Sequence, residues 1–340
     1  MAWKVLVTAR AFWVSGQAAQ KALETAGCQV ARSPQAGPLP EPELISLLQG
    51  CQAVIASSDP YTARVFAACS DLKIVSRCGV GIDSVDLRAA TEAGVVVTNT
   101  PGAMTDAVAD YTFGLLLALA RKIVEGERLM RSGGWGEYPG VLVYGKTLGL
   151  VGMGQIGQGV ARRAAGFGMR ILAYDPPLAQ AASGAEGLSG GLPAVTFVEL
   201  DDLLAQSDFV SVHAPSTPET QSLFNASRFA RMKPTAYFIN TARGALVDEE
   251  ALLAALETGQ IAGAGIDVYR QEPLPPDHPL RRAPNCLLTP HNAFNAVESV
   301  TAMSLISAEN ILALLQGSRP AFVCNPAVWN SPTLRIKDEG

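Results

Sequence analysis

The sequence predicts an α/β protein with two doubly wound parallel-sheet domains, and three observations carry this prediction. The chain has 340 residues, which at about 150 residues per domain favours two domains. Short apolar runs alternate with helix-like stretches along most of its length, as in parallel sheets covered by helices on both faces. Hydrophobic residues make up 48% of the chain and charged residues 17%, below the ~25% charge usual in soluble domains. Much of the chain must therefore be buried, which excludes a mainly disordered protein.

The first hundred residues contain the first series of alternating strands and helices. Strands are expected at residues 4–8, 53–56, 73–76 and 95–98. Helices are expected around residues 17–26, 41–48 and 61–67. Strands joined in this way by helices predict a parallel sheet and a first domain.

The second series follows one long helix, expected over residues 104–130, and a loop over residues 132–145. Six strands are expected at residues 147–151, 171–174, 209–213, 237–240, 264–268 and 286–289. Six strands with intervening helices are typical of a doubly wound dinucleotide-binding fold. A surface loop is expected at residues 184–191, a last helix at 296–315, and a loosely held tail after residue 330.

A glycine-rich loop follows the strand at 147–151. It consists of Gly152, Met153, Gly154, Gln155, Ile156 and Gly157, and a helix-like stretch comes next. Glycines at this spacing allow a tight turn and close backbone approach to a pyrophosphate at the helix N-terminus. The next strand ends at Asp175, 175 − 157 = 18 residues after the last glycine, close to the ~20 expected for the carboxylate that holds the ribose diol. No nearby Arg or Lys could receive a 2′-phosphate, so NAD is predicted rather than NADP. The alternative is a glycine-rich turn followed by a surface aspartate.

Three functional side chains follow later strands of the same half, where ligands of open α/β sheets gather: Arg243, Glu272 and His291. Hydride transfer to or from a 2-hydroxy acid needs a proton carrier that titrates near neutrality, which histidine provides. A neighbouring carboxylate stabilises the imidazolium, and arginine binds a substrate carboxylate with its planar fork of donors. The alternatives are a structural salt bridge for Arg243 and a solvated loop position for Glu272. Of the other two histidines, His278 is expected in a turn and His213 beside the cofactor.

Charge and composition exclude several classes of function. The net charge is −5 without a run of Lys or Arg, so small molecules are expected as partners rather than nucleic acid. The longest apolar stretch, residues 113–120, is far shorter than the ~20 residues that span a bilayer. The first residues read as a strand rather than a signal peptide, so a cytoplasmic protein is expected. The six cysteines lack C-x-x-C spacing, so we expect free thiols and no metal site.

With these residues the chain resembles the D-2-hydroxyacid dehydrogenase family. The resemblance reaches to about Asn325 and rests on several segments in order: residues 99–102, 109–113, 149–157, 240–248, 265–268 and 289–291. It implies a Rossmann NAD-binding domain (residues 100–291) inserted in a flavodoxin-like substrate domain, formed by residues 1–99 and a return helix within 292–330. It also implies a homodimer through the NAD-binding domain, in which the long helix after Thr105 takes part.

The resemblance also implies roles for individual residues. Arg243, Glu272 and His291 become the catalytic trio. Arg243 also binds substrate, together with the backbone amides of Val80 and Gly81 and the loop at Ser57. Besides the glycine loop, Gln155, Ile156 and Asp175, the implied cofactor residues are Val108, His213, Ala214, Pro215, Thr220, Thr241, Ala242 and Asp267.

Several subfamilies stay open. The motifs are most similar to those of phosphoglycerate dehydrogenases and of glyoxylate or hydroxypyruvate reductases. Phosphoglycerate dehydrogenases typically carry an arginine where Ser57 stands, which weakens the case for a phosphorylated substrate unless Arg64 or Arg77 substitutes. Phe294, after His291, is similar to the residue in some D-lactate dehydrogenases, and Glu272 argues against formate dehydrogenase, which carries glutamine. The alternatives are a D-3-phosphoglycerate dehydrogenase of serine synthesis and, from another class, an NAD-sensing corepressor-like binding protein.

Overall fold

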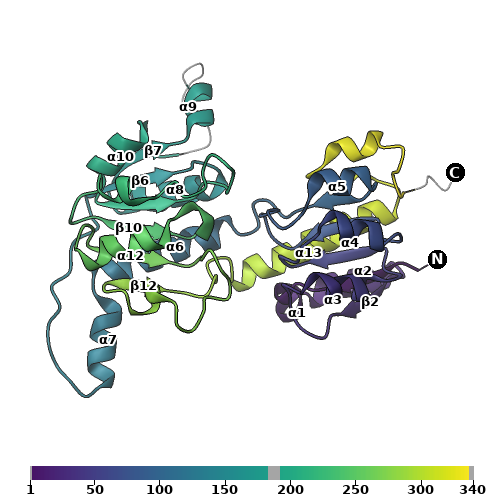
Figure 1. Cartoon of the computed structure of the whole chain (residues 1–340), viewed down its shortest axis with the longest axis horizontal. Helices are drawn as coiled ribbons and strands as arrows, with labels where there is room; N and C mark the ends of the chain where they lie inside the picture. Colours follow the sequence, from purple (N-terminus) through teal and green to yellow (C-terminus); the bar gives the residue numbers. More distant parts are fainter. Residues whose placement is uncertain (1, 183–191, 337–340) are drawn as a thin grey trace. The chain divides into compact units, whose positions relative to one another are not determined.

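The computed structural model describes residues 2–182 and 192–336, and the chain forms two compact units (Figure 1). One unit comprises Met1–Met104 and Asn295–Gly340, and the other is Thr105–Phe294. These boundaries lie five and three residues beyond the expected ones at 99 and 291 (104 − 99 and 294 − 291). Each unit has its own parallel sheet, so the predicted fold class is confirmed.

The first unit contains a five-stranded sheet in the order β2-β1-β3-β4-β5, the strand order of flavodoxin-like folds. Its strands are β1 (Lys4–Val7), β2 (Gln29–Arg32), β3 (Ala53–Ala56), β4 (Ile74–Arg77) and β5 (Val96–Thr98). Its helices are α1 (Arg10–Ser15), α2 (Gln17–Thr25), α3 (Glu41–Leu48), α4 (Ala63–Ala68), α5 (Leu87–Glu92) and α13 (Val297–Leu315), followed by the 3-10 helix η3 (Pro326–Asn330). The central strand β3 is entirely buried, as its unbroken apolar run predicts.

Strand β2 and helices α1 and α5 were not predicted, and the prediction of a loosely held tail after residue 330 was wrong for residues 331–336, the part that the structure describes. β2 is an edge strand that is nowhere fully buried, so it lacks the apolar run that marks central strands. The tail is held at least as far as Arg335, whose guanidinium donates to the carbonyls of Phe66 (2.8 Å) and Leu72 (3.0 Å) at the end of α4 and beyond it. A cation is favourable beside the carbonyls of a helix C-terminus, which explains why this segment stays in place.

α13 is apolar and long enough to cross a membrane by length and composition, but half of its apolar window is buried inside the protein. Its backbone accepts a hydrogen bond from strand β4, from Ser76 Oγ to the carbonyl of Ser307 at 3.0 Å. Helices that pass the length test while packing on a sheet are core helices of globular units, and α13 is one of these.

The second unit contains a seven-stranded parallel sheet in the order β12-β11-β10-β9-β6-β7-β8. Its strands are β6 (Thr147–Val151), β7 (Arg170–Tyr174), β8 (Val195–Phe197), β9 (Phe209–Val212), β10 (Tyr237–Asn240), β11 (Gly263–Ile266) and β12 (Cys286–Leu288). Its helices are α6 (Thr105–Ala120), α7 (Ile123–Arg131), α8 (Gln155–Gly166), α9 (Pro176–Ala182), α10 (Leu200–Gln206), α11 (Ala226–Phe229) and α12 (Glu249–Glu257), with the 3-10 helices η1 (Gly244–Leu246) and η2 (Pro279–Arg282). The chain reverses its winding between β6 and β9, and ligands bind at such switch points.

Two expectations for this unit were wrong. The sheet has a seventh strand, β8, a three-residue edge strand too short to show a pattern. The helix expected over residues 104–130 is two helices, because Lys122 adopts a left-handed conformation with φ 55° and ends α6. The Lys122 ammonium lies 3.3 Å from Glu125 Oε1 and from Asn285 Oδ1, which hold this break. The loop expected at 184–191 lies outside the described residues.

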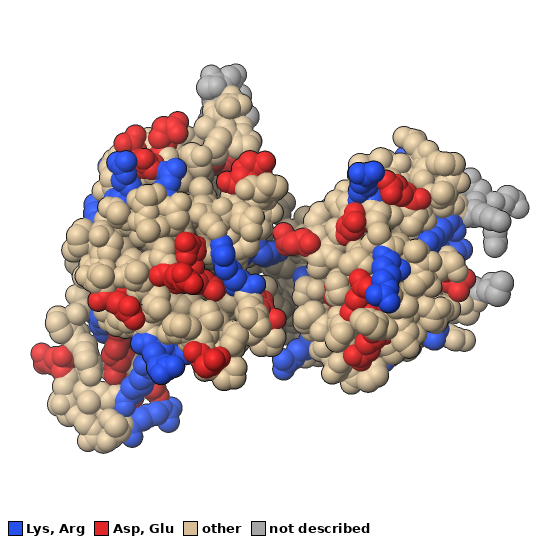
Figure 2. Space-filling model, viewed as in Figure 1, with Lys and Arg blue, Asp and Glu red and all other residues tan. Residues whose placement is uncertain are grey.

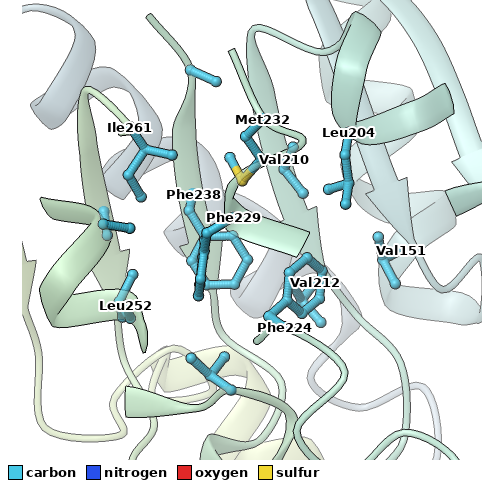
Figure 3. Close-up of a cluster of buried hydrophobic side chains, with 14 of the residues drawn as sticks. Val151, Leu204, Val210, Val212, Phe224, Phe229, Met232, Phe238, Leu252 and Ile261 are labelled. Atoms are coloured by element: carbon cyan, nitrogen blue, oxygen red, sulfur yellow. The ribbon is translucent and has the colours of Figure 1, made fainter. Parts of the chain in front are cut away.

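Hydrophobic clusters cover both faces of the seven-stranded sheet. Figure 3 shows one of them, in which Phe238 of β10 packs on Phe224 and Phe229 with ring centroids 4.8 and 5.3 Å apart. Its neighbours along β10, Tyr237 and Ile239, belong to the cluster on the opposite face. Successive side chains of a strand point to opposite faces, so both faces are buried, and the sheet forms a rigid support for the loops at its carboxyl edge.

Candidate active site

The glycine loop after β6 forms an open cradle. Gly152 has φ +96°, and a Cβ there would lie 2.6 Å from the backbone nitrogen of Ala214, so only glycine fits. A Cβ on Gly154, in contrast, would meet nothing within 4 Å. Helix α8 begins at Gln155 without a side-chain cap, so its first amides point into this open space. These features fit a pyrophosphate, whose charge is favourable at a helix N-terminus.

Asp175 lies at the end of β7, as expected for a residue that holds the ribose diol. Its Oδ2 accepts a hydrogen bond from Met153 N at 2.8 Å, and its Oδ1 accepts one from Leu178 N at 3.0 Å. The carboxylate therefore also fixes the glycine loop and the first turn of α9, a function that the sequence spacing did not predict.

His213 follows β9 directly, and its backbone nitrogen donates to Val151 O at 2.7 Å, at the base of the glycine loop. Its Nε2 lies 2.9 Å from Ser211 Oγ, whereas its buried Nδ1 has no hydrogen-bond partner among the described residues. Burial lowers the pKa of His213 to about 3, so the imidazole is neutral near pH 7 and unsuited to proton transfer.

The remaining predicted cofactor residues lie in the same unit. Thr220 closes the loop after β9 through its Oγ1, which donates to Pro215 O at 2.7 Å. Thr241 Oγ1 lies 3.1 Å from Thr112 Oγ1, which bonds the carbonyl of Val108 in α6. The other predicted residues on these two loops are Ala214 and Ala242. Their contacts with the cofactor stay predictions.

The carboxylate of Glu272 and the imidazole of His291 form a close pair, with Oε2 and Nδ1 2.6 Å apart. Tyr269 N donates to the other carboxylate oxygen, Oε1, at 2.9 Å. Partial burial raises the pKa of Glu272, but the hydrogen bond and charge of His291, the Tyr269 amide and the charge of Arg243 outweigh it, and the pKa is lowered. Glu272 is therefore ionised at neutral pH. It orients the ring through Nδ1 and leaves Nε2 available for a proton transfer.

The loop that carries His291 is held by Asp267, at the end of β11. His291 has φ +50°, a left-handed conformation uncommon for this residue, and its backbone nitrogen donates to Asp267 O at 2.7 Å. The fully buried Asp267 carboxylate accepts hydrogen bonds from Thr289 Oγ1 (2.6 Å), Asn292 N (2.9 Å) and Ala293 N (2.9 Å). Asp267, predicted as a cofactor residue, thus supports the His291 loop, and a direct cofactor contact by its side chain stays a prediction.

Arg243 follows β10 and joins the same group. Its NH1 donates to its neighbour Ala242 O at 2.7 Å, and its charge contributes to the lowered pKa of Glu272. A Cβ on Gly244 would lie 1.9 Å from the carbonyl carbon of Tyr269, so the segment carrying Arg243 packs backbone to backbone against the one carrying Glu272. The structure therefore brings Arg243, Glu272 and His291 together.

Tyr269 is a supporting residue that the sequence analysis missed. Its hydroxyl oxygen lies 3.0 Å from Ile266 O and 2.9 Å from Thr289 O, so its one proton is shared between the carbonyls at the ends of β11 and β12. A tyrosine between a buried strand and the predicted catalytic carboxylate was the available signal, because buried hydroxyls require partners.

The predicted substrate residues lie in the first unit, at the carboxyl ends of β3 and β4. Ser57 N donates to Thr8 Oγ1 at 2.9 Å. Asn99 Nδ2 donates to Val80 O at 2.9 Å, beside Gly81, and Thr100 N donates to Gly79 O at 3.1 Å. This edge of the sheet therefore presents Ser57, Val80 and Gly81 on ordered loops.

Charges of both signs are mixed on one face of the molecule. On the face in Figure 2, Lys and Arg side chains are interspersed with Asp and Glu in both units. Within residues 2–182 and 192–336, no three His, Cys, Asp or Glu side chains gather as metal ligands would. His278 occupies a turn, as expected, where its Nδ1 accepts a hydrogen bond from Leu280 N at 3.4 Å.

Comparison with known proteins agrees with this geometry. Residues 113–293 match the model of the D-isomer specific 2-hydroxyacid dehydrogenase, NAD binding domain. The chain is 44% identical over 304 residues to a glyoxylate reductase of Korarchaeum cryptofilum, covering 87% of this chain and 88% of that protein. It is 41% identical over 282 residues to a D-3-phosphoglycerate dehydrogenase of Synechocystis, covering 82% of this chain but 50% of that protein.

A solved structure, that of the TT0316 protein from Thermus thermophilus, superposes with a TM-score of 0.84 at 41% identity, over 94% of this chain and 99% of the other. With the matched family model and these relatives, the cradle and the Glu272–His291 pair identify the chain as a member of the D-isomer specific 2-hydroxyacid dehydrogenases, a family of NAD-dependent oxidoreductases.

Proposed function

We propose that this protein reduces a small, unphosphorylated 2-keto acid to the 2-hydroxy acid with NADH, of the D configuration where C2 is a stereocentre, with glyoxylate and hydroxypyruvate as the leading substrates. The observation that carries the proposal is the 2.6 Å contact between Glu272 and His291, beside the charge of Arg243. An acid–base histidine next to a carboxylate and an arginine is the residue set that this reaction requires.

Each residue of the trio has a distinct function in the proposed reaction. When bound, the nicotinamide cofactor supplies the hydride that reaches C2 of the substrate. Arg243 binds the substrate carboxylate and polarises the keto oxygen. His291 donates the proton to that oxygen from Nε2, and the ionised Glu272 stabilises the imidazolium beforehand. In the oxidation direction His291 accepts the proton instead.

The preference for an unphosphorylated substrate is supported by the arginines near the proposed substrate loops. Arg64 is highly exposed and pairs with Glu41 at 3.3 Å. Arg77 folds onto its own loop, where its guanidinium donates to Cys78 O and packs against Gly79. Because Ser57 replaces the expected phosphate-binding arginine and both substitutes are engaged elsewhere, we propose that the carboxylate meets the amides of Val80 and Gly81 and that no phosphate is bound.

A substrate panel tests this proposal. NADH oxidation is measured with glyoxylate, hydroxypyruvate, phosphohydroxypyruvate and pyruvate. We expect kcat/KM to be highest for glyoxylate or hydroxypyruvate and at least about tenfold lower for phosphohydroxypyruvate, since unpaired burial of a dianion is unfavourable. A preference for phosphohydroxypyruvate would instead identify a D-3-phosphoglycerate dehydrogenase. Tight NADH binding without turnover of any 2-keto acid would favour the NAD-sensing binding protein.

We also propose a cytoplasmic homodimer that forms through the NAD-binding domain. Helix α7 and the loop after it extend away from the seven-stranded sheet (Figure 1) and carry large exposed apolar side chains: Ile123, Met130, Trp135, Leu142 and Tyr144. Exposed apolar patches of this kind mark protein interfaces. The six cysteines are free thiols, in keeping with a reducing compartment. Light scattering of the wild type and of a Trp135→Ser, Leu142→Ser variant tests the dimer, and a monomeric wild type would refute it.

A further inference from the structure

We infer that Arg270 is a positioning residue that, together with Glu249, braces the three loops that carry Thr220, Arg243 and Glu272. The inference rests on the proposed functions of Arg243, Glu272 and His291. It adds a residue that lies outside the trio and that none of the sequence motifs indicates.

The guanidinium of Arg270 joins two segments that are far from it in the sequence. Its Nε donates to Val247 O at 3.0 Å, and its NH2 donates to Ser222 Oγ. These two segments are themselves paired, because Ser222 N donates to Ala245 O at 2.8 Å and Phe224 N donates to Leu246 O at 2.9 Å. Arg270 therefore joins its own loop to the two loops that carry Ser222 and Val247, which are already paired with each other.

Each of the three loops carries one of the proposed functional residues. Thr220 lies two residues before Ser222, Arg243 lies four residues before Val247, and Glu272 lies two residues after Arg270. Gly244, next to Arg243, packs against the backbone of Tyr269, next to Arg270. A shift of Arg270 is therefore transmitted directly to the carboxylate that contacts His291.

Glu249 holds the backbone of the same residue. It is the first residue of α12, and its Oε1 accepts a hydrogen bond from Arg270 N at 2.9 Å. Its Oε2 lies 3.4 Å from Nε2 of His278, and its side chain is largely buried. Arg270 is thus fixed at its main chain by Glu249 and at its side chain by Ser222 and Val247. A surface hollow of about 400 Å³ lies beside these side chains. Because the guanidinium faces solvent there, its charge is screened and its effect is geometric.

The brace matters because of what surrounds His291. His291 Nδ1 lies 2.6 Å from Oε2 of the Glu272 carboxylate, which orients the ring. The charge of Arg243 contributes to the lowered pKa of Glu272. The buried carboxylate of Asp267 holds the His291 loop by accepting a hydrogen bond from Ala293 N. If the segment 269–272 loosens, the carboxylate of Glu272 moves away from His291 while the cationic Arg243 stays on its own loop. The contact between the Glu272 carboxylate and His291 Nδ1, on which the proposed proton transfer depends, is then weakened.

Arg270→Met tests the inference, since methionine keeps much of the apolar stem and removes all five donors. Arg231→Met is the matched control, because Arg231 is an exposed arginine of the same domain. Its ion pair with Asp201 is long, at 3.7 Å, and therefore weak. In glyoxylate reduction we expect kcat/KM of Arg270→Met to fall by about tenfold or more, and the alkaline limb of its pH profile to move down by about half a pH unit or more. Arg231→Met should match the wild type in both readouts. Arg270→Lys should recover only part, because an ammonium lacks the planar fork that spans Val247 O and Ser222 Oγ.

A second variant separates local loosening from a general loss of folding. Glu249→Gln keeps an acceptor for Arg270 N, so it should retain more activity than Glu249→Ala, measured on protein that is folded by circular dichroism. The inference would be overturned if Arg270→Met had the same pH profile and the same kcat/KM as the wild type, whatever its unfolding temperature. Glu272→Gln distinguishes the two levels: if it moves the limb and Arg270→Met does not, only the brace is refuted. If Glu272→Gln also leaves the limb in place, both the brace and the proposed function are refuted.

Discussion

The contact between Gly244 and Tyr269 makes a sharp prediction, because it joins the loop of Arg243 to the loop of Glu272. In Gly244→Ala the new Cβ would lie 1.9 Å from Tyr269 C, 2.2 Å from Tyr269 O and 2.4 Å from Arg270 N. All three atoms belong to the backbone, so no side chain can rotate to make room. One of the two segments must move.

The size of that movement follows from the structure. Ordinary contacts of a Cβ begin near 3.4 Å, so the segments must separate by up to 3.4 − 1.9 = 1.5 Å. Glu272 lies three residues beyond Tyr269, and its contact with His291 is 2.6 Å. A separation of even 1 Å would leave that pair beyond hydrogen-bonding distance, and misplacement on this scale reduces rates by about 100-fold. Overpacking should also destabilise the fold by about 1–3 kcal/mol.

Steady-state reduction of glyoxylate and a thermal melt measure the two effects. We expect kcat/KM of Gly244→Ala to fall by about 100-fold and NADH binding, followed by fluorescence, to weaken by less, because Thr241 and Ala242 lie on this loop but the glycine loop and Asp175 lie on other segments. Gly166→Ala is the control, since a Cβ at this helical glycine meets nothing within 4 Å. It should be neutral or stabilising by up to about 1 kcal/mol. Wild-type turnover in Gly244→Ala would refute the rigid coupling between the two loops.

Three further predictions concern single residues. Arg243→Ala should retain NADH binding and lose at least about 100-fold in kcat, and wild-type turnover would exclude it from the trio. Asp175→Ala should weaken NADH binding more than NADPH binding, and it should also destabilise the protein by about 1 kcal/mol, because Met153 N loses its acceptor; an unchanged ratio of the two Kd values would refute the specificity argument. The pKa of His213 is lowered to about 3 in the folded protein. Below pH 6.5 the unfolded chain therefore binds a proton at this histidine that the folded chain does not, and the free energy of unfolding falls as the pH decreases from 6.5 toward 3. The loss by pH 5 should be up to about 2 kcal/mol and should disappear in His213→Gln, as urea melts at pH 5 and pH 7 can show; equal pH dependence in both proteins would contradict it.

Central elements of the fold could be predicted to the residue from the sequence. The strands at 53–56, 147–151 and 237–240 are apolar runs that end at polar residues or glycine, and they match β3, β6 and β10. Edge strands β2 and β8 could not be predicted, because each has a neighbouring strand on one side only and its side chains are incompletely buried. The break at Lys122 in the predicted long helix could not be predicted either, because it depends on a contact with Asn285, which is distant in the sequence.

The same distinction holds for the site. The glycine loop, Asp175 and the pair of Glu272 and His291 could be predicted because each follows a strand within a short motif. The contacts that support them join distant segments, such as the Asp267 carboxylate with the amides of Asn292 and Ala293, or Arg270 with Ser222. Nothing in the local sequence of either partner indicates such a contact, so only the folded chain reveals it.

The pH profile of kcat/KM for glyoxylate reduction, compared between the wild type and Glu272→Gln, tests the central claim most directly. The lowered pKa of Glu272 keeps its carboxylate ionised across the neutral range, where its Oε2 lies 2.6 Å from His291 Nδ1. We predict that the alkaline limb of the glutamine variant lies at least about one pH unit below that of the wild type, with a lower maximum. Superimposable limbs in the two enzymes would contradict the proposal that Glu272 and His291 act together.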